Sequence, residues 1–149
     1  QGDWSSDVCS SDLGIFNLLE SGTQRLFIVD NIISGNGTGI SSTADNVATL
    51  LNTEISDNTI ANNNSDGIQL RSFGGASHFA LIENNIIDGN GVFGGNGIRL
   101  VAGDPSATTS LLDVTVIDSF ITDTANGGGI LGNVIDDAQL NLQIGRAHV

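Results

Sequence analysis

Acidic and amide residues recur at one repeated position of this sequence, where they could bind a cation. The residues are Asp30, Asp57, Asn84 and Asp118. Carboxylates held one strand spacing apart, about 5 Å, could share a cation that relieves their repulsion, and Ca²⁺ takes oxygen ligands. The sequence therefore predicts a candidate calcium site at Asp30, Asp57 and Asp118, and no other cofactor. The alternative interpretation is a solvated turn in which each Asp accepts backbone amide hydrogen bonds.

Aromatic and basic side chains are the candidate contacts to a sugar ligand. Phe73, Phe79 and Phe93 lie in segments that we predict to be loops, where a ring can stack on a sugar or merely cover the edge of the core. Arg71 and Arg99 flank predicted strands and follow their Gly-Ile glycines by four and two residues. We therefore expect the two arginines to be offset from one another. The competing interpretation is two ordinary surface arginines.

The sequence contains no recognisable motif of residues for acid, base or nucleophilic catalysis. Glycoside hydrolysis needs two carboxyl groups about 5–9 Å apart on one face. The one acidic doublet, Asp136-Asp137, precedes the last predicted strand and is expected to form a turn. His78 lies in the segment FGGASHF, which we predict to be a loop, and it has no evident metal-binding partner. The sequence therefore predicts no catalytic residue.

A repeat of the dipeptide Gly-Ile indicates which elements would position these residues. It occurs at residues 14, 39, 67, 97 and 129, at intervals of 25, 28, 30 and 32. A second block precedes each of the last four occurrences, and aligning these blocks gives several matching columns. The columns are Ile28, Ile55, Ile82 and Val116; Asn31, Asn58, Asn85 and Ser119; Ile33, Ile60, Ile87 and Ile121; Asn36, Asn63, Asn90 and Thr124; and Ile40, Ile68, Ile98 and Ile130.

Each repeat predicts three short strands, which in the first full unit lie near residues 26–29, 32–34 and 39–42. Apolar residues alternate within these segments, as in a strand with one buried face, and turns rich in Asn, Gly and Asp separate them. One unit is too small to bury its own apolar face, so the units must stack and bring like side chains above one another. A sandwich or barrel of hairpins is the alternative, since Asn-Gly turns also occur.

The pattern N-x-I-x-x-N followed by G-I-x-L resembles the repeat of pectate-lyase-like proteins over residues 14–143. The resemblance implies an all-β, right-handed parallel β-helix of about four to five coils, truncated at both ends. It also implies an asparagine ladder along one turn, at Asn31, Asn58 and Asn85, and aliphatic stacks in a narrow interior. Such folds include polysaccharide lyases, glycoside hydrolases, adhesins and structural shafts, so the fold alone does not give an activity.

The two ends lack the repeat and resemble translated sequencing-adapter sequence of the kind found in assembled metagenomic genes. The chain thus divides into a non-native-looking leader at 1–13, the repeats at 14–143 and a non-native-looking tail at 144–149. Cys9, Trp4 and His148 fall in these ends and are set aside. We expect the natural protein to continue with neighbouring coils.

Charge narrows the range of partners. The 17 acidic residues against four arginines and no lysine give a formal net charge of −13, which disfavours nucleic acid and anionic membranes. No apolar run approaches the ~20 residues of a membrane span. We expect a non-catalytic extracellular or cell-surface segment, structural or adhesin-like, that could bind polysaccharide. The alternative is a fragment of a polysaccharide lyase or glycoside hydrolase whose catalytic coils lie outside this window.

Overall fold

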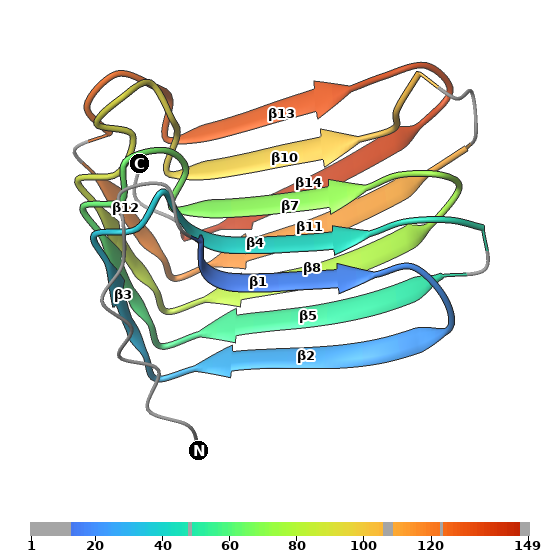
Figure 1. Ribbon diagram of the computed structural model, residues 1–149. Helices are drawn as coiled ribbons and strands as arrows, with labels where there is room; N and C mark the ends of the chain where they lie inside the picture. The colour runs from blue at the N-terminus through green and yellow to red at the C-terminus, as the bar shows by residue number, and fades with distance from the viewer. Residues whose placement is uncertain (1–12, 48, 106–108, 123, 147–149) are drawn as a thin grey trace.

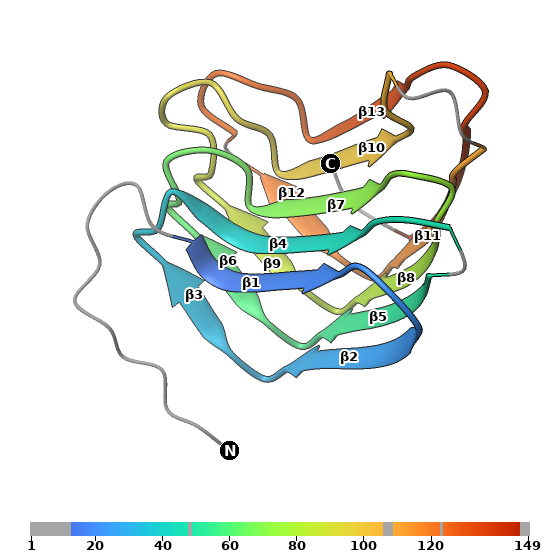
Figure 2. The same ribbon diagram turned by 45° about the vertical axis from the view of Figure 1, so that its right-hand side comes forward.

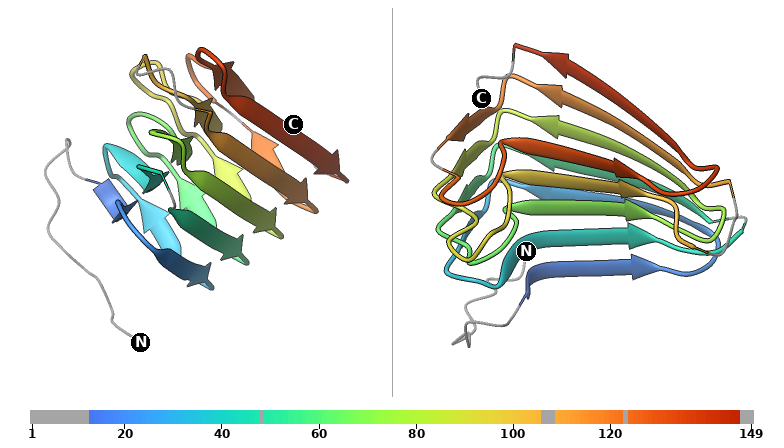
Figure 3. Two further views of the ribbon diagram at one scale, coloured as in Figure 1. Left: turned by 90° about the vertical axis from the view of Figure 1, so that its right-hand side faces the viewer. Right: turned by 90° about the horizontal axis from the view of Figure 1, so that it is seen from above.

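The computed structural model of the chain is a right-handed parallel β-solenoid of about five turns (Figures 1 and 3). It describes residues 13–47, 49–105, 109–122 and 124–146. These residues contain no helix, and every strand pairs in parallel with the equivalent strand of at least one adjacent coil. The predicted stacking of repeats is therefore confirmed, and the alternative built from hairpins is wrong.

The strands form three sheets that make the walls of the solenoid (Figure 2). Sheet A contains β1 (Leu13–Leu19), β4 (Thr38–Ala44), β7 (Ile68–Ser72), β10 (Ile98–Ala102) and β13 (Ile130–Val134). Sheet B contains β2 (Thr23–Val29), β5 (Leu50–Ser56), β8 (Ser77–Glu83), β11 (Leu111–Ile117) and β14 (Gln139–Gly145). The narrow sheet C contains β3 (Ile32–Ser34), β6 (Thr59–Ala61), β9 (Ile86–Asp88) and β12 (Phe120–Thr122).

The interior is filled by aliphatic columns in the predicted alignment. One column is Ile33, Ile60, Ile87 and Ile121, and another is Ile40, Ile68, Ile98 and Ile130, which Ile15 extends. A third is Ile28, Ile55, Ile82 and Val116. The members in the central coils are fully buried. Each such side chain contributes roughly 1.5–3 kcal/mol through removal from water, so the columns are the main source of stability.

A ladder of asparagines follows the turn between sheets B and C. The main-chain N–H and side-chain amide of Asn31 both donate to Asn58 Oδ1, at 3.0 and 3.1 Å. Asn58 makes the same two bonds to Asn85 Oδ1, each at 3.0 Å. At the next rung only the N–H of Asn85 donates, to Ser119 Oγ at 3.3 Å. The ladder predicted at Asn31, Asn58 and Asn85 is confirmed, and it weakens where the hydroxyl of Ser119 replaces the amide.

A second ladder, not predicted from the sequence, lies at the turn between sheets C and A. Asn36 donates twice to Asn63 Oδ1, at 3.0 and 3.1 Å, and Asn63 donates twice to Asn90 Oδ1, at 3.1 and 2.8 Å. Asn63 and Asn90 are fully buried, so these bonds satisfy polar groups that would otherwise be costly to bury. The two ladders therefore fix both ends of sheet C.

The glycine of each Gly-Ile pair is required by close packing at the start of a sheet A strand. A methyl group added at Gly39 would lie 2.8 Å from Cγ2 of Ile60 and 2.5 Å from the carbonyl oxygen of Gly67 in the next coil. Gly14, Gly67 and Gly97 have equivalent neighbours. The dipeptide that reveals the repeat therefore recurs because no side chain fits between adjacent coils at this point.

The strand β14 runs two residues beyond the boundary predicted at residue 143. Ile144 pairs with Val116 and so extends the column of Ile28, and Gly145 pairs with Ile117. Residues 1–12 and 147–149, which hold Cys9, Trp4 and His148, lie outside the described residues.

Candidate functional site

The outer face of sheet B carries two rows of varied side chains that cross the strands. The register aligns Arg25, Asn52, Phe79, Asp113 and Asn141 in the first row. It aligns Phe27, Glu54, Leu81, Thr115 and Gln143 in the second row. Because successive residues of a strand point to opposite faces, these side chains project outward while their neighbours fill the core. The face thus presents aromatic, amide, acidic and basic groups to solvent.

A pocket of about 340 Å³ lies along the first four strands of these rows, and we call it the sheet B pocket. Its lining includes Arg25, Phe27, Asn52, Glu54, Phe79, Leu81, Asp113 and Thr115. This volume lies at the lower end of the range seen for small-molecule sites. The pocket combines apolar surface from two phenylalanines and a leucine with polar groups on neighbouring strands.

The aromatic rings of the sheet B pocket are available to a ligand. Phe27 and Phe79 are 58% and 39% exposed, whereas the interior of the solenoid is filled by aliphatic side chains. The guanidinium carbon of Arg25 lies 5.8 Å from the centroid of the Phe27 ring, which is within the range of a cation–π contact. This contact involves Phe27, and Phe79 lies two coils away with its own row neighbours Asn52 and Asp113.

The two carboxylates of the sheet B pocket come from strands that are not adjacent. Glu54 is on β5 and Asp113 is on β11, with β8 between them and a two-residue offset along the strands. Sheet spacings place their Cα atoms about 12 Å apart. Asp113 Oδ2 accepts a hydrogen bond from Asn141 Nδ2 at 3.1 Å, and Glu54 Oε1 lies 3.4 Å from the hydroxyl of Ser56. Each carboxylate therefore has a neighbour of its own.

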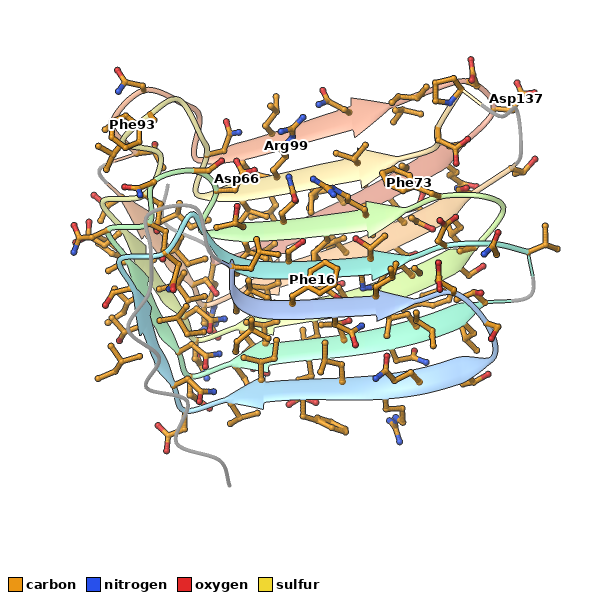
Figure 4. All side chains as sticks on the ribbon, in the orientation of Figure 1. Phe16, Asp66, Phe73, Phe93, Arg99 and Asp137 are labelled. Carbon is orange, nitrogen blue, oxygen red and sulfur yellow. The ribbon has the colours of Figure 1, made fainter. Side chains whose placement is uncertain are left out.

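The predicted glycan contacts do not form one site. The prediction that Phe79 lies in a loop is wrong, because it belongs to β8 and lines the sheet B pocket. Phe73 and Phe93 do lie in loops, at opposite ends of the sheet A strands (Figure 4). Arg71 and Arg99 project from the outer face of sheet A, where they align with Val101 and Gln69 and are therefore offset, as expected.

The predicted calcium-binding residues occupy the first position of the two-residue turns between sheets B and C, and the asparagine ladder occupies the second. Asp30, Asp57, Asn84 and Asp118 all have positive φ, at 62°, 58°, 54° and 48°. Asp and Asn tolerate this left-handed conformation better than most residues, which explains the repeated residue type. Among the described residues no group of three or more His, Cys, Asp or Glu side chains could hold a metal ion. The geometry favours the interpretation of this column as a turn.

The imidazole of His78 is also placed differently from the sequence expectation. The prediction of a loop is wrong: His78 lies in β8, points inward and is fully buried. The buried position lowers its pKa to about 4, so the ring is neutral at physiological pH. The His78 ring lies in the interior of the solenoid and does not line the sheet B pocket. Asp136 and Asp137 lie in a turn, as predicted.

Sequence reasoning missed most of the residues that line the sheet B pocket. The missed residues are Arg25, Phe27, Asn52, Glu54, Leu81, Asp113 and Thr115. They occupy the positions five and three residues before the turn residues Asp30, Asp57, Asn84 and Asp118. Aligning the repeats on that turn and comparing those two positions would have found them, because residues at equal offsets stack in a solenoid.

The described part of the chain has no helix with the length and apolar character needed to cross a lipid bilayer. Comparison with family models, with curated proteins and with solved structures gave no match to this chain.

Proposed function

We propose that this chain is a non-catalytic β-solenoid segment of an extracellular or cell-surface protein, and that it binds a neutral polysaccharide along the outer face of sheet B. The observation that carries the proposal is the sheet B pocket, where exposed Phe27 and Phe79 stand beside amide, carboxylate and guanidinium groups. Resemblance of the repeat to pectate-lyase-like proteins agrees with carbohydrate as the ligand class.

Sugar rings suit the sheet B pocket because they have apolar C–H faces and a rim of hydroxyl groups. Exposed phenylalanine rings can stack on the faces, while Asn52 and the carboxylates of Glu54 and Asp113 can bond the hydroxyls. Phe27 and Phe79 lie two coils apart, about 12 Å between Cα atoms from sheet spacings. This separation suits an extended chain of several sugars better than a single ring.

Charge favours a neutral polymer for the sheet B pocket. The pocket holds one guanidinium, Arg25, against the carboxylates of Glu54 and Asp113, and the whole chain carries a formal charge of −13. A polyanion would meet repulsion both locally and from the protein as a whole. Hydroxyl-rich polymers without charge avoid this cost.

Binding is favoured over hydrolysis by the neighbours of the two carboxylates. A glycosidase needs one carboxyl group as acid and another as base or nucleophile on either side of the scissile bond. Glu54 and Asp113 are on non-adjacent strands, and Asp113 is held by Asn141. Such carboxylates suit hydrogen bonds to hydroxyl groups.

The experiment is a screen of neutral polysaccharides by affinity electrophoresis, followed by titration of the best ligand against two matched variants. Phe79→Ala removes a ring of the sheet B pocket, whereas Phe93→Ala removes an 82% exposed ring in the loop before β10. We expect Phe79→Ala to weaken binding by about tenfold and Phe93→Ala to leave it unchanged. Thermal melts of both variants serve as the control for folding.

Two results obtained with a bound polymer would overturn the proposal. One is equal weakening by both substitutions, or by Phe93→Ala alone, which would place the ligand elsewhere. The other is the release of shortened or unsaturated products from a bound polymer, which would assign the chain to the lyases or hydrolases. Absence of binding across the screen would also count against a glycan ligand.

A further inference from the structure

Two arginines stand side by side on the outer face of sheet A, remote from the sheet B pocket. Arg71 is on β7 and Arg99 is on the adjacent β10, and the register offsets them by two residues. Sheet spacings then place their Cα atoms about 8 Å apart, well within the reach of two long side chains. Figure 4 shows Arg99 on this face near Asp66.

Such a pair is unfavourable in the absence of a ligand. Burial and the charge of Arg99 both lower the pKa of Arg71, while Asp66 opposes that change. The chain has only four cationic side chains and a formal charge of −13. Acidic side chains are therefore numerous enough for each arginine to have one of its own. Here two of the four lie side by side and share a single nearby carboxylate, that of Asp66.

The nearest carboxylate does not neutralise both arginines. Asp66 is 1% exposed, and its Oδ1 accepts hydrogen bonds from the N–H and side-chain amide of Asn96, at 2.8 and 3.0 Å. Its Oδ2 accepts from Gln69 at 3.2 Å and lies 3.9 Å from Arg99 Nη1. Asp66 is thus held by the loop and by Gln69, and its ion pair with Arg99 is long.

Donor groups of the arginine pair remain unused within the part of the chain that the structure describes. Arg99 Nε is buried from solvent and has no hydrogen-bond partner among those residues. In the same set of residues Arg71 forms no ion pair within 4.0 Å, and the one ion pair found is that of Arg99 with Asp66. Guanidinium groups present several N–H donors in a planar fork that matches carboxylate and sulfate oxygens.

We propose that Arg71 and Arg99 form a binding site for a singly charged oxyanion group, a carboxylate or a sulfate ester, carried by a ligand that lies over sheet A. The ligand group supplies the negative charge that relieves the repulsion between the two guanidiniums. The Arg99 side chain is 41% exposed, so the terminal N–H groups of its guanidinium can donate to such a group. This site is separate from the sheet B pocket and does not depend on the function proposed for that pocket.

Ionic strength gives the arginine site a distinctive signature. An anionic ligand is repelled by the distant carboxylates of the protein, and at physiological salt charges beyond about 8 Å are largely screened. Contact with the two arginines is screened much less. Moderate salt should therefore weaken this binding less than it weakens ordinary attraction between a polyanion and a basic surface.

The first test titrates sodium methyl sulfate and, separately, sodium acetate into the full chain, with sodium chloride holding ionic strength constant. The readout is the NMR resonances of the arginine Nε–Hε groups. We expect saturable shifts of the Arg71 and Arg99 signals, and loss of saturation in Arg71→Gln and Arg99→Gln. The matched control is Arg146→Gln, which removes one exposed cation elsewhere and should leave the titration unchanged. Linear, unsaturated shifts, or an equal effect of Arg146→Gln, would overturn the proposal.

The second test compares dextran, carboxymethyl-dextran and dextran sulfate, which share one backbone and differ in charge. Stronger retention of one charged polymer, abolished by Arg71→Gln but not by Phe79→Ala, identifies whether carboxylate or sulfate is preferred. Retention of neither charged polymer would contradict a ligand-borne anion at this site. Retention of neutral dextran that depends on Phe79 tests the sheet B pocket instead, so the two proposals can fail independently.

Discussion

The imidazole Nε2 of His78 lies 2.9 Å from the hydroxyl oxygen of Thr53 in the adjacent coil, inside the solenoid. On its other side Nδ1 lies 2.9 Å from the carbonyl oxygen of Arg71. Since a carbonyl can only accept, Nδ1 carries the proton, and Nε2 accepts from the hydroxyl of Thr53. The hydroxyl of Ser42 lies 3.5 Å from Thr53 and continues the chain. The neutral imidazole is therefore fully satisfied in the core.

Acidification should destabilise the fold through His78. Its pKa falls from 6.5 to about 4 on folding, chiefly because burial disfavours the charged ring. The unfolded chain therefore binds the proton more readily, and stability is complete above pH 6.5 and declines as pH falls toward about 4. The contribution is about 3 kcal/mol, from the shift in pKa. Chemical denaturation at several pH values should show this slope in the native chain and a flatter slope in His78→Gln. Equal slopes would contradict the assignment.

A charge placed in the aliphatic column should unfold the central coils. Ile87 is fully buried in its column, whereas Thr59, on the adjacent narrow strand, is partly exposed and faces outward. Ile87→Asp buries an unpaired carboxylate and should cost more than about 4 kcal/mol, while Thr59→Asp should cost less than about 1 kcal/mol. Thermal melts followed by circular dichroism measure both. The reverse order would mean that the inward and outward faces of sheet C are exchanged.

Loss of one ladder amide should be costly because it leaves several buried groups without partners. The Asn58 amide donates to the carbonyls of Ile28 and Ser56, at 2.8 and 2.9 Å, in addition to its ladder bonds. Asn58→Ala should lower the free energy of unfolding by about 2–4 kcal/mol. Asn126→Ala, which removes one exposed bond to the Val92 carbonyl, serves as the control and should cost under about 1 kcal/mol. Similar effects of both would argue against a structural ladder.

The glycine of a Gly-Ile pair should be less replaceable than a glycine that has space for a methyl group. A methyl group at Gly67 would lie 2.7 Å from the carbonyl oxygen of Gly97 and 3.0 Å from Cγ2 of Ile87. At Gly128 the nearest atom would be 3.7 Å away, an ordinary contact. Gly67→Ala should therefore destabilise the chain by about 1–3 kcal/mol, and Gly128→Ala should be close to neutral. Denaturant midpoints distinguish the two, and equal midpoints would show that adjacent coils can separate without cost.

Prediction from sequence succeeded for the residues that every coil must repeat. The columns of Ile33 and Ile40 and the ladder of Asn31 were predicted because stacking places equal positions one above another. Prediction failed for His78 and Phe79. In β8 a polar imidazole and the small Ala80 point inward, while Phe79 points outward. This reverses the usual alternation, so the segment reads as a loop.

The sequence by itself determined the parallel solenoid, its buried columns and its asparagine turn, because the physical demands of stacking are the same in every coil and leave a repeated pattern. Only the tertiary structure decided which outward side chains meet. Arg25, Asn52, Phe79 and Asp113 share one row although no two have the same residue type, and Arg71 comes beside Arg99 from a different coil. Outward positions are not constrained by stacking, so their residue types vary, and only the register of the strands brings them together.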